Sequence, residues 1–200
     1  MTAPTPNQRP KRRPRRRKQP RRPEEKNHTE LSSHLLQPVA LSLGSNVGPG
    51  IATLRWAIDS LERILEAVTV GSLYRTTPVS PIAQPEFFNT ALVARTHYDP
   101  EALLGACKAV EWAAGRRTSQ RLGPRVLDID LLVWGDRVTE RPELTLPHPE
   151  LGRRRFYLEP LAEIAPDLPI PPHGDTPGVL LDRLAKLGDS AAVFKLDWPH

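Results

Sequence analysis

The sequence of 200 residues contains a single cysteine, Cys107. No intrachain disulfide can form, which is typical of proteins in a reducing compartment. No run of about 18 consecutive apolar residues occurs, so no transmembrane helix is expected. The N-terminal segment also lacks the apolar core of a secretory signal. These absences predict a cytoplasmic protein with no membrane partner. Cys107 lies in the apolar stripe of an expected helix and is interpreted as a core residue.

The sequence also lacks the common signatures of nucleotide and hydrolytic sites. It has no G-x-x-x-x-G-K-S/T loop, no G-x-G-x-x-G loop and no protein-kinase motif. Its six histidines show neither H-E-x-x-H nor zinc-ligand spacing, and no G-x-S-x-G turn is present. The usual P-loop, dinucleotide-binding, zinc and serine-hydrolase classes are therefore not indicated.

Positive charge is concentrated at the N-terminus. Residues 1–30 carry eleven Lys or Arg and three Glu, whereas residues 31–200 have a net charge of −3. The high isoelectric point therefore belongs to a tail, and no nucleic-acid binding is expected through the fold. Residues 1–30 contain no Val, Ile, Leu or aromatic residue, so residues 1–37 are predicted to be a disordered basic tail. Three interpretations of this tail stay open: a solvated extension, a misassigned start site, or an arm that weakly contacts RNA or another polyanion.

Residues 38–200 are predicted to form one domain. Strands are expected at residues 39–43, 68–74, 87–95 and 123–135, and helices at residues 51–65 and 100–114. The order strand–helix–strand–strand–helix–strand is typical of an α+β, ferredoxin-like fold, in which an antiparallel sheet carries both helices on one face. Residues 136–200 are expected to form a C-terminal appendage with helices near residues 156–164 and 179–187.

Two carboxylates stand out in the last expected strand. Asp128 and Asp130 are two residues apart, so their side chains share one face, with Cα atoms about 6.6 Å apart. Two unpaired carboxylates this close repel each other, and a divalent cation such as Mg²⁺ removes that cost. Nearby arginines, among them Arg116 and Arg125, suit a metal-bound polyphosphate. The alternative is an edge strand whose two aspartates simply face water.

The segment RLGPRVLDIDLL (residues 121–132) resembles the signature of the 6-hydroxymethyl-7,8-dihydropterin pyrophosphokinase family of folate biosynthesis. Four further blocks resemble the family in the same order, at residues 41–48, 72–96, 144–151 and 155–168. The resemblance spans about residues 39–185. It implies a ferredoxin-like fold and an ATP-dependent diphosphotransferase. Such an enzyme moves the β,γ-pyrophosphoryl group of ATP to the pterin's hydroxymethyl oxygen, giving AMP and the pterin diphosphate.

The resemblance also implies roles for individual residues. Asp128 and Asp130 would hold two Mg²⁺ ions on the triphosphate, and Arg116 and Arg125 would be catalytic. The implied ATP-binding set is Glu111, Arg116, Arg125, Leu131, Thr145, His148 and Arg154. The implied pterin-binding set is Thr76, Thr77, Val79, Phe87, Asn89, Leu122 and Phe156. His148 is interpreted as a hydrogen-bond donor to phosphate, no side-chain base is evident, and a monomer is expected.

Three positions depart from the family pattern. Thr118 stands where an arginine is usual, Leu122 replaces a tryptophan, and Phe87 replaces a common tyrosine. We hypothesise that Arg117 partly replaces the missing arginine. Loops 75–86 and 116–124 are candidate lids. Two other functional classes stay open: an inactive pterin- or nucleotide-binding relic, and an RNA-binding module. The second lacks the aromatic RNP1 motif and has a negatively charged body.

Overall fold

The computed structural model describes residues 36–78, 80–117, 123–189 and 192–199. Apart from its last two residues, the predicted disordered tail lies outside this part of the chain. The predicted pterin-binding residues Val79 and Leu122 also lie outside it, as does Thr118. The first strand begins at Gln37, one residue before the predicted start of the domain.

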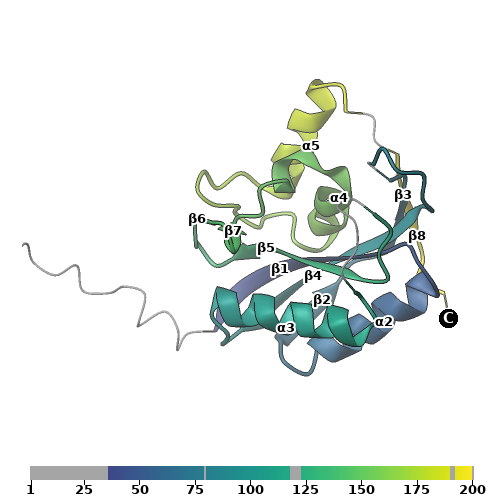
Figure 1. Ribbon diagram of the computed structural model, residues 1–200. Coiled ribbons are helices and arrows are strands. Elements are labelled where there is room, and N and C mark those ends of the chain that lie inside the picture. The colour runs from purple at the N-terminus through teal and green to yellow at the C-terminus, as the bar shows by residue number, and fades with distance from the viewer. Residues whose placement is uncertain (1–35, 79, 118–122, 190–191, 200) are drawn as a thin grey trace, which may run out of the picture.

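The described chain forms a mixed α/β fold around one large sheet (Figure 1). Its elements are β1 (Gln37–Ser45), α2 (Gly50–Leu61), β2 (Glu66–Val70), β3 (Leu73–Thr76), β4 (Phe87–Thr96), α3 (Pro100–Ala113), β5 (Asp128–Trp134), β6 (Thr139–Arg141), β7 (Leu144–Leu146), α4 (Arg155–Ile164), α5 (Pro177–Lys186) and β8 (Val193–Leu196). The sheet has the order β5-β1-β4-β3-β8, and β2 also pairs with β4. All of these pairings are antiparallel, which confirms the predicted ferredoxin-like α+β fold.

Helices cover both faces of the sheet. Figure 1 shows α2 and α3 on one face and α4 and α5 on the other. Leu41 and Leu43 of β1 pack in the same core as α2 and α3, and Cys107 of α3 is buried there as predicted. Ala40, on the other face of β1, belongs to a second core with α4 and α5. The C-terminal appendage is therefore the second layer that buries the sheet.

Local sequence signals account well for one helix and less well for the middle strands. Asp99 caps α3 by accepting a hydrogen bond from the Ala102 N–H at 2.7 Å, and Pro100 occupies the first turn, as expected. The single strand predicted at residues 68–74 is instead divided into β2 and β3 around Gly71. A Cβ atom at Gly71 would lie 3.2 Å from the carbonyl oxygen of Pro160, so α4 approaches the backbone closely at this break.

The predicted helices of the appendage are confirmed as α4 and α5, but its strands were not predicted. β6 pairs with β7, and β8 adds a strand to the sheet beside β3. These strands have only three or four residues, and β8 (VFKL) carries a weak apolar pattern. Within the described residues, no helix is long and apolar enough to cross a membrane.

A polar junction at the protein surface attaches α4 to the sheet. Glu163 of α4 accepts hydrogen bonds from the Ser72 hydroxyl (2.7 Å), the Tyr74 hydroxyl (2.9 Å) and Lys195 Nζ of β8 (3.0 Å). Burial alone would raise the pKa of Glu163, but the hydrogen bonds from Ser72, Lys195 and Tyr74 outweigh it and lower the pKa to about 2. The ionised carboxylate thus connects three elements.

We expect Glu163→Gln to lower the free energy of unfolding at pH 7 by about 1 kcal/mol, because charge-assisted hydrogen bonds are replaced by neutral ones. A depressed pKa gives stability that is present above the ordinary value of 4.5 and is lost as the pH falls toward about 2. The difference in the free energy of unfolding between the original protein and Glu163→Gln should therefore become smaller as the pH falls from about 4.5 to about 2. Urea denaturation at several pH values measures this difference. Glu62→Gln, an exposed position at the end of α2, is the control and should change stability by only a few tenths of a kcal/mol.

Candidate active site

Strand register brings the predicted site residues together. Asp128 of β5 pairs with Gly44 of β1, Gly44 pairs with Asn89 of β4, and Asn89 pairs with Tyr74 of β3. These four residues form one row across the sheet. Gly44 has no side chain, so Asp128 and Asn89 face the same space from either side of it. This space lies on the sheet face that carries α4 and α5.

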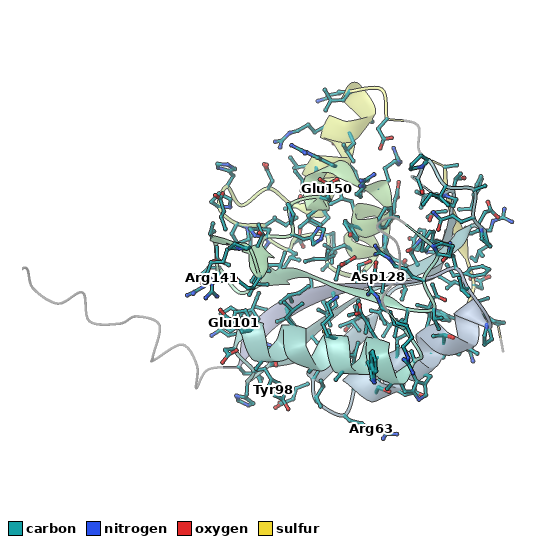
Figure 2. The ribbon with its side chains drawn as sticks, viewed as in Figure 1. Arg63, Tyr98, Glu101, Asp128, Arg141 and Glu150 are labelled. Atoms are coloured by element: carbon teal, nitrogen blue, oxygen red, sulfur yellow. The ribbon has the colours of Figure 1, made fainter. Side chains whose placement is uncertain are left out.

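A cavity of about 260 Å³ opens over this row. It is bounded by the sheet, by the loop after β3, by the segment before β5, and by the segment that leads into α4. Figure 2 shows Asp128 at the sheet and Glu150 on the side occupied by α4 and α5. The predicted residues that line the cavity are Thr76, Thr77, Phe87, Asn89, Arg125, Asp128, Asp130, His148, Arg154 and Phe156. The sheet thus gathers residues that are up to 80 positions apart in the sequence.

The two aspartates have different partners. Asp128 forms ion pairs with the guanidinium groups of Arg116 and Arg125. Asp130 accepts a hydrogen bond from the Tyr157 hydroxyl at 2.8 Å. Burial, followed by the charge of Asp128, raises the pKa of Asp130 to about 6, although the Tyr157 hydrogen bond acts in the opposite direction. Burial and the charge of Asp130 raise the pKa of Tyr157 well above its ordinary value, so its hydroxyl remains a donor.

The donor set fits Mg²⁺. Carboxylate oxygens are hard ligands, and Mg²⁺ is usually held by one or two carboxylates while water and substrate phosphates complete its coordination. No cluster of three or more His, Cys, Asp or Glu in the described residues is arranged to hold a metal alone. A Mg²⁺ ion at Asp128 and Asp130 would therefore share its coordination with a polyphosphate, for which Arg125 and Arg154 supply positive charge at the same cavity.

Glu111 supports the site from behind the sheet and is not among the cavity-lining residues. It is buried and accepts a hydrogen bond from the Ile129 N–H at 2.7 Å. It also forms an ion pair with Arg116, whose guanidinium reaches Asp128. Burial raises the pKa of Glu111, while the Ile129 N–H, Lys108 and Arg116 oppose this effect. The predicted ATP residue Glu111 thus lies where it positions Arg116.

Three other predicted ATP residues also lie outside the cavity lining, namely Leu131, Thr145 and Arg116, the last of which reaches Asp128 from the side. Leu131 alternates with Asp130 along β5, and its side chain is buried in the core with α2 and α3. Thr145 lies in the short strand β7, where its hydroxyl donates to the carbonyl of Arg141 at 3.4 Å. The structure therefore does not bring the side chains of Leu131 and Thr145 to the cavity.

The far end of the cavity is suited to a flat heterocycle. Asn89 is buried and donates a hydrogen bond through Nδ2 to the Thr76 hydroxyl at 2.7 Å, which fixes the amide. A fixed amide presents both a donor and an acceptor to a ring edge. Phe87 and Phe156 line the same cavity and supply apolar faces.

One loop residue that the sequence analysis did not identify connects the loops around the cavity. Asn46 accepts a hydrogen bond from the Arg125 N–H at 2.8 Å and donates to Gln84 (2.9 Å) and to the carbonyl of Pro85 (3.1 Å). It thereby joins the loop after β1 to the candidate lid 75–86 and to Arg125, the residue that directly follows the candidate lid 116–124. Residues 44–50 (GSNVGPG) predict only a loop, because no local pattern shows which distant backbone an Asn side chain will meet.

A phosphate-binding ferredoxin-like domain is the class that this fold and cavity define. The family model described as 7,8-dihydro-6-hydroxymethylpterin-pyrophosphokinase (HPPK) matches residues 40–166, more than half of the chain. The chain belongs to this family, which confirms the resemblance predicted from the sequence.

Known relatives agree with this assignment. A protein of Pseudomonas aeruginosa named 2-amino-4-hydroxy-6-hydroxymethyldihydropteridine pyrophosphokinase is 38% identical over 148 residues, which cover 73% of this chain and 91% of that protein. A Methylorubrum extorquens protein of the same name is 40% identical over 152 residues, covering 75% and 93%. The crystal structure of wild-type Plasmodium falciparum HPPK-DHPS matches with a TM-score of 0.57 and 15% identity, covering 76% of this chain. This chain spans only 45% of that longer one, and the likeness concerns the fold.

Proposed function

We propose that the chain transfers the pyrophosphoryl group of ATP to 6-hydroxymethyl-7,8-dihydropterin, giving AMP and the pterin diphosphate in folate biosynthesis. One observation carries the proposal: in a chain of this family, a single cavity has a carboxylate pair with arginines at one end and Asn89 with two phenylalanines at the other. The first end suits a metal-bound triphosphate and the second suits a pterin. The hydroxymethyl oxygen would then meet the β-phosphorus between them.

Catalysis would depend on positioning and charge neutralisation. Mg²⁺ bound at Asp128 and Asp130 would neutralise charge on the triphosphate, and we propose two ions because two carboxylates share the face. Arg116 and Arg125, now paired with Asp128, can reach phosphate oxygens through the same guanidinium groups. No separate side-chain base is assigned.

His148 suits the role of a phosphate hydrogen-bond donor. Burial lowers the pKa of His148, so the neutral ring is favoured. Its Nδ1 accepts a hydrogen bond from the Glu150 N–H at 3.3 Å, which assigns the proton to Nε2. His148 lines the cavity, so this N–H is available to a phosphate oxygen.

We also propose the extent of the catalytic domain, the oligomeric state and the cellular location of the enzyme. Residues 38–200 would form the catalytic domain, since the family match and the cavity both lie within them. The chain would act as a monomer, because one copy supplies both ends of the cavity, and it would work in the cytoplasm, where ATP is available. The basic segment 1–37 would make weak contacts with polyanions, while the negatively charged remainder would not bind nucleic acid.

Nucleotide analysis tests the reaction directly. The full chain is incubated with ATP, Mg²⁺ and 6-hydroxymethyl-7,8-dihydropterin, and AMP and pterin products are quantified. We expect AMP only when the pterin is present, in an amount equal to the pterin diphosphate. ATP binding without AMP formation would instead indicate the inactive relic. Absence of binding of both ATP and pterin would show that the site is wrongly assigned.

The structure does not place Arg117 where a substitute for the missing family arginine would be needed. Its guanidinium lies 4.2 Å from the centre of the Trp112 ring and donates to the carbonyls of Trp112 (3.1 Å) and Arg116 (3.0 Å). It is not among the residues that line the cavity. The hypothesis that Arg117 binds the triphosphate is therefore not supported by this geometry.

We expect Arg117→Ala to leave kcat and the KM for ATP within about twofold of the original values, since it removes only surface contacts: a cation–π contact worth about 0.5–1 kcal/mol and two hydrogen bonds to backbone carbonyls. Arg125→Ala, which removes a cavity-lining guanidinium, is the comparison and should reduce kcat/KM for ATP by at least about tenfold. Steady-state kinetics measures both. A large loss in Arg117→Ala would restore Arg117 to the ATP site.

A further inference from the structure

Tyr157 lies at the junction of the two halves of the cavity. It follows Phe156 in α4, is only 5% exposed, and its ring centroid lies 4.4 Å from that of Phe156. On another side, its ring meets that of His148 edge-on, with centroids 5.1 Å apart. Tyr157 is thus packed between a phenylalanine of the pterin end and a histidine of the phosphate end.

The hydroxyl of Tyr157 reaches across from α4 to the sheet. It donates to Asp130 Oδ2 at 2.8 Å, with the rest of the ring held by its two aromatic neighbours. A packed aromatic ring has few rotamers, so the hydroxyl position is fixed by the fold. Asp130 therefore receives a hydrogen bond from a rigid donor on the opposite layer.

This contact makes the two aspartates unequal. Asp128 is bound through both oxygens by charged guanidiniums, which a polyphosphate also attracts. Asp130 is bound through one oxygen by a neutral phenol, which has no positive charge with which to compete against a cation for the carboxylate. Among the described residues, no hydrogen bond to Asp130 Oδ1 is made, and this oxygen is free to bind a metal.

We propose that Tyr157 is a positioning residue that fixes Asp130 as a single-oxygen metal ligand, holding Oδ2 so that Oδ1 faces the cation. The inference rests on the proposed function, which makes Asp130 a metal ligand. Hydrogen bonds from outer residues commonly orient the carboxylates that bind metals, and removing one typically reduces metal affinity or activity by about 10–100-fold. Tyr157 would act on Asp130 and not on substrate.

Tyr157→Phe removes the hydroxyl and keeps the ring. Tyr74→Phe is the matched control, because Tyr74 is also 5% exposed and also donates to a carboxylate, that of Glu163, but does not line the cavity. Asp130→Asn reports whether Asp130 binds metal at all. The three variants separate loss of a buried phenol from loss of metal positioning.

The measurement is the affinity of the full chain for Mn²⁺, which is obtained from the electron paramagnetic resonance signal of free Mn²⁺. The assay contains the α,β-methylene analogue of ATP in place of ATP, because the proposed reaction breaks the bond between the β-phosphorus and the oxygen that bridges it to the α-phosphate. We expect Tyr157→Phe to weaken Mn²⁺ binding by about tenfold and Tyr74→Phe to leave it within about twofold. In turnover, Tyr157→Phe should raise the Mg²⁺ concentration needed for half-maximal rate while the KM for pterin stays within about twofold.

The outcomes distinguish the two proposals. If Asp130→Asn binds Mn²⁺ as tightly as the original protein, the metal assignment is wrong and the role of Tyr157 is overturned with it. If Asp130→Asn loses affinity but Tyr157→Phe does not, only the role of Tyr157 is overturned. If Tyr157→Phe and Tyr74→Phe weaken Mn²⁺ binding equally, the effect is a general loss of packing and the proposal fails.

Discussion

Asp130→Asn is expected to lower kcat by at least about a hundredfold and to leave the protein folded and at least as stable as before. The amide has the shape of the carboxylate and can still accept the Tyr157 hydrogen bond, but it lacks the charge that a hard cation requires. Each factor of ten in rate corresponds to about 1.4 kcal/mol of transition-state stabilisation. Losing one of two anionic metal ligands is expected to cost at least twice that amount.

The stability of this variant follows from the same electrostatics. In the metal-free protein, Asp130 is an acid whose pKa is raised from 3.8 to about 6 by burial and by Asp128. Its ionised form is disfavoured by folding, so its contribution to stability falls as the pH rises from about 4 to 6. At pH 7.5 the asparagine removes this penalty. Thermal unfolding without metal should therefore show a melting temperature equal to or above that of the original protein.

Asp128→Asn provides the contrast. Asp128 neutralises Arg116 and Arg125, so its loss leaves the partly buried guanidinium of Arg125 without this carboxylate and leaves Arg116 paired with Glu111. Both aspartate variants should lose turnover, but only Asp128→Asn should also lose thermal stability. Near-normal turnover in Asp130→Asn would show that Asp130 is not a metal ligand. A fall in melting temperature of both variants alike would show that the two carboxylates are structurally equivalent.

Sequence patterns correctly placed those parts of the fold and site that depend on neighbouring residues in the chain. Alternation along β5 put Asp128 and Asp130 on one face, and the helix signals around Asp99 and Pro100 located α3. The order of strands and helices identified the antiparallel sheet, because few sheet topologies are compatible with that order. Local periodicity is set by the backbone itself, so it can be read without knowledge of the partner strands.

The parts that depend on distant neighbours could not be predicted. The break between β2 and β3 at Gly71 reflects the approach of α4, about 90 residues later, and β8 forms only because β3 offers it an edge. Arg117 was hypothesised to replace part of the arginine missing from the family pattern, but its side chain lies on Trp112. Tyr157 gave no signal, since an aromatic residue in an amphipathic helix is usually part of the core. In each case tertiary contacts decide where the side chain lies.

Gly44→Ala is the second substitution for which we expect a large effect. It tests whether the pairing of Gly44 with Asn89 shapes the pterin-binding end of the cavity. A Cβ atom at Gly44 would lie 2.8 Å from Asn89 Oδ1 and 3.9 Å from the Phe87 ring. Asn89 has little room to move because it is buried and bonded to Thr76. The amide would be displaced from the ring edge that it recognises. We expect the KM for pterin to rise at least about tenfold, with a stability loss of about 1–3 kcal/mol from overpacking.

The effect of Gly44→Ala should be specific in two respects. Gly105→Ala makes the same change in α3, where a Cβ atom meets nothing within 4 Å, and it should stabilise the protein by about 0.5–1 kcal/mol without changing the KM for pterin. In an Asn89→Ala background, the clash partner is absent, so Gly44→Ala should add little further loss of pterin affinity. If the two losses instead add fully, Gly44 acts independently of Asn89. Equal increases in KM for ATP and pterin would show that the alanine distorts the whole cavity, because Gly44 separates Asp128 from Asn89 in the row across the sheet.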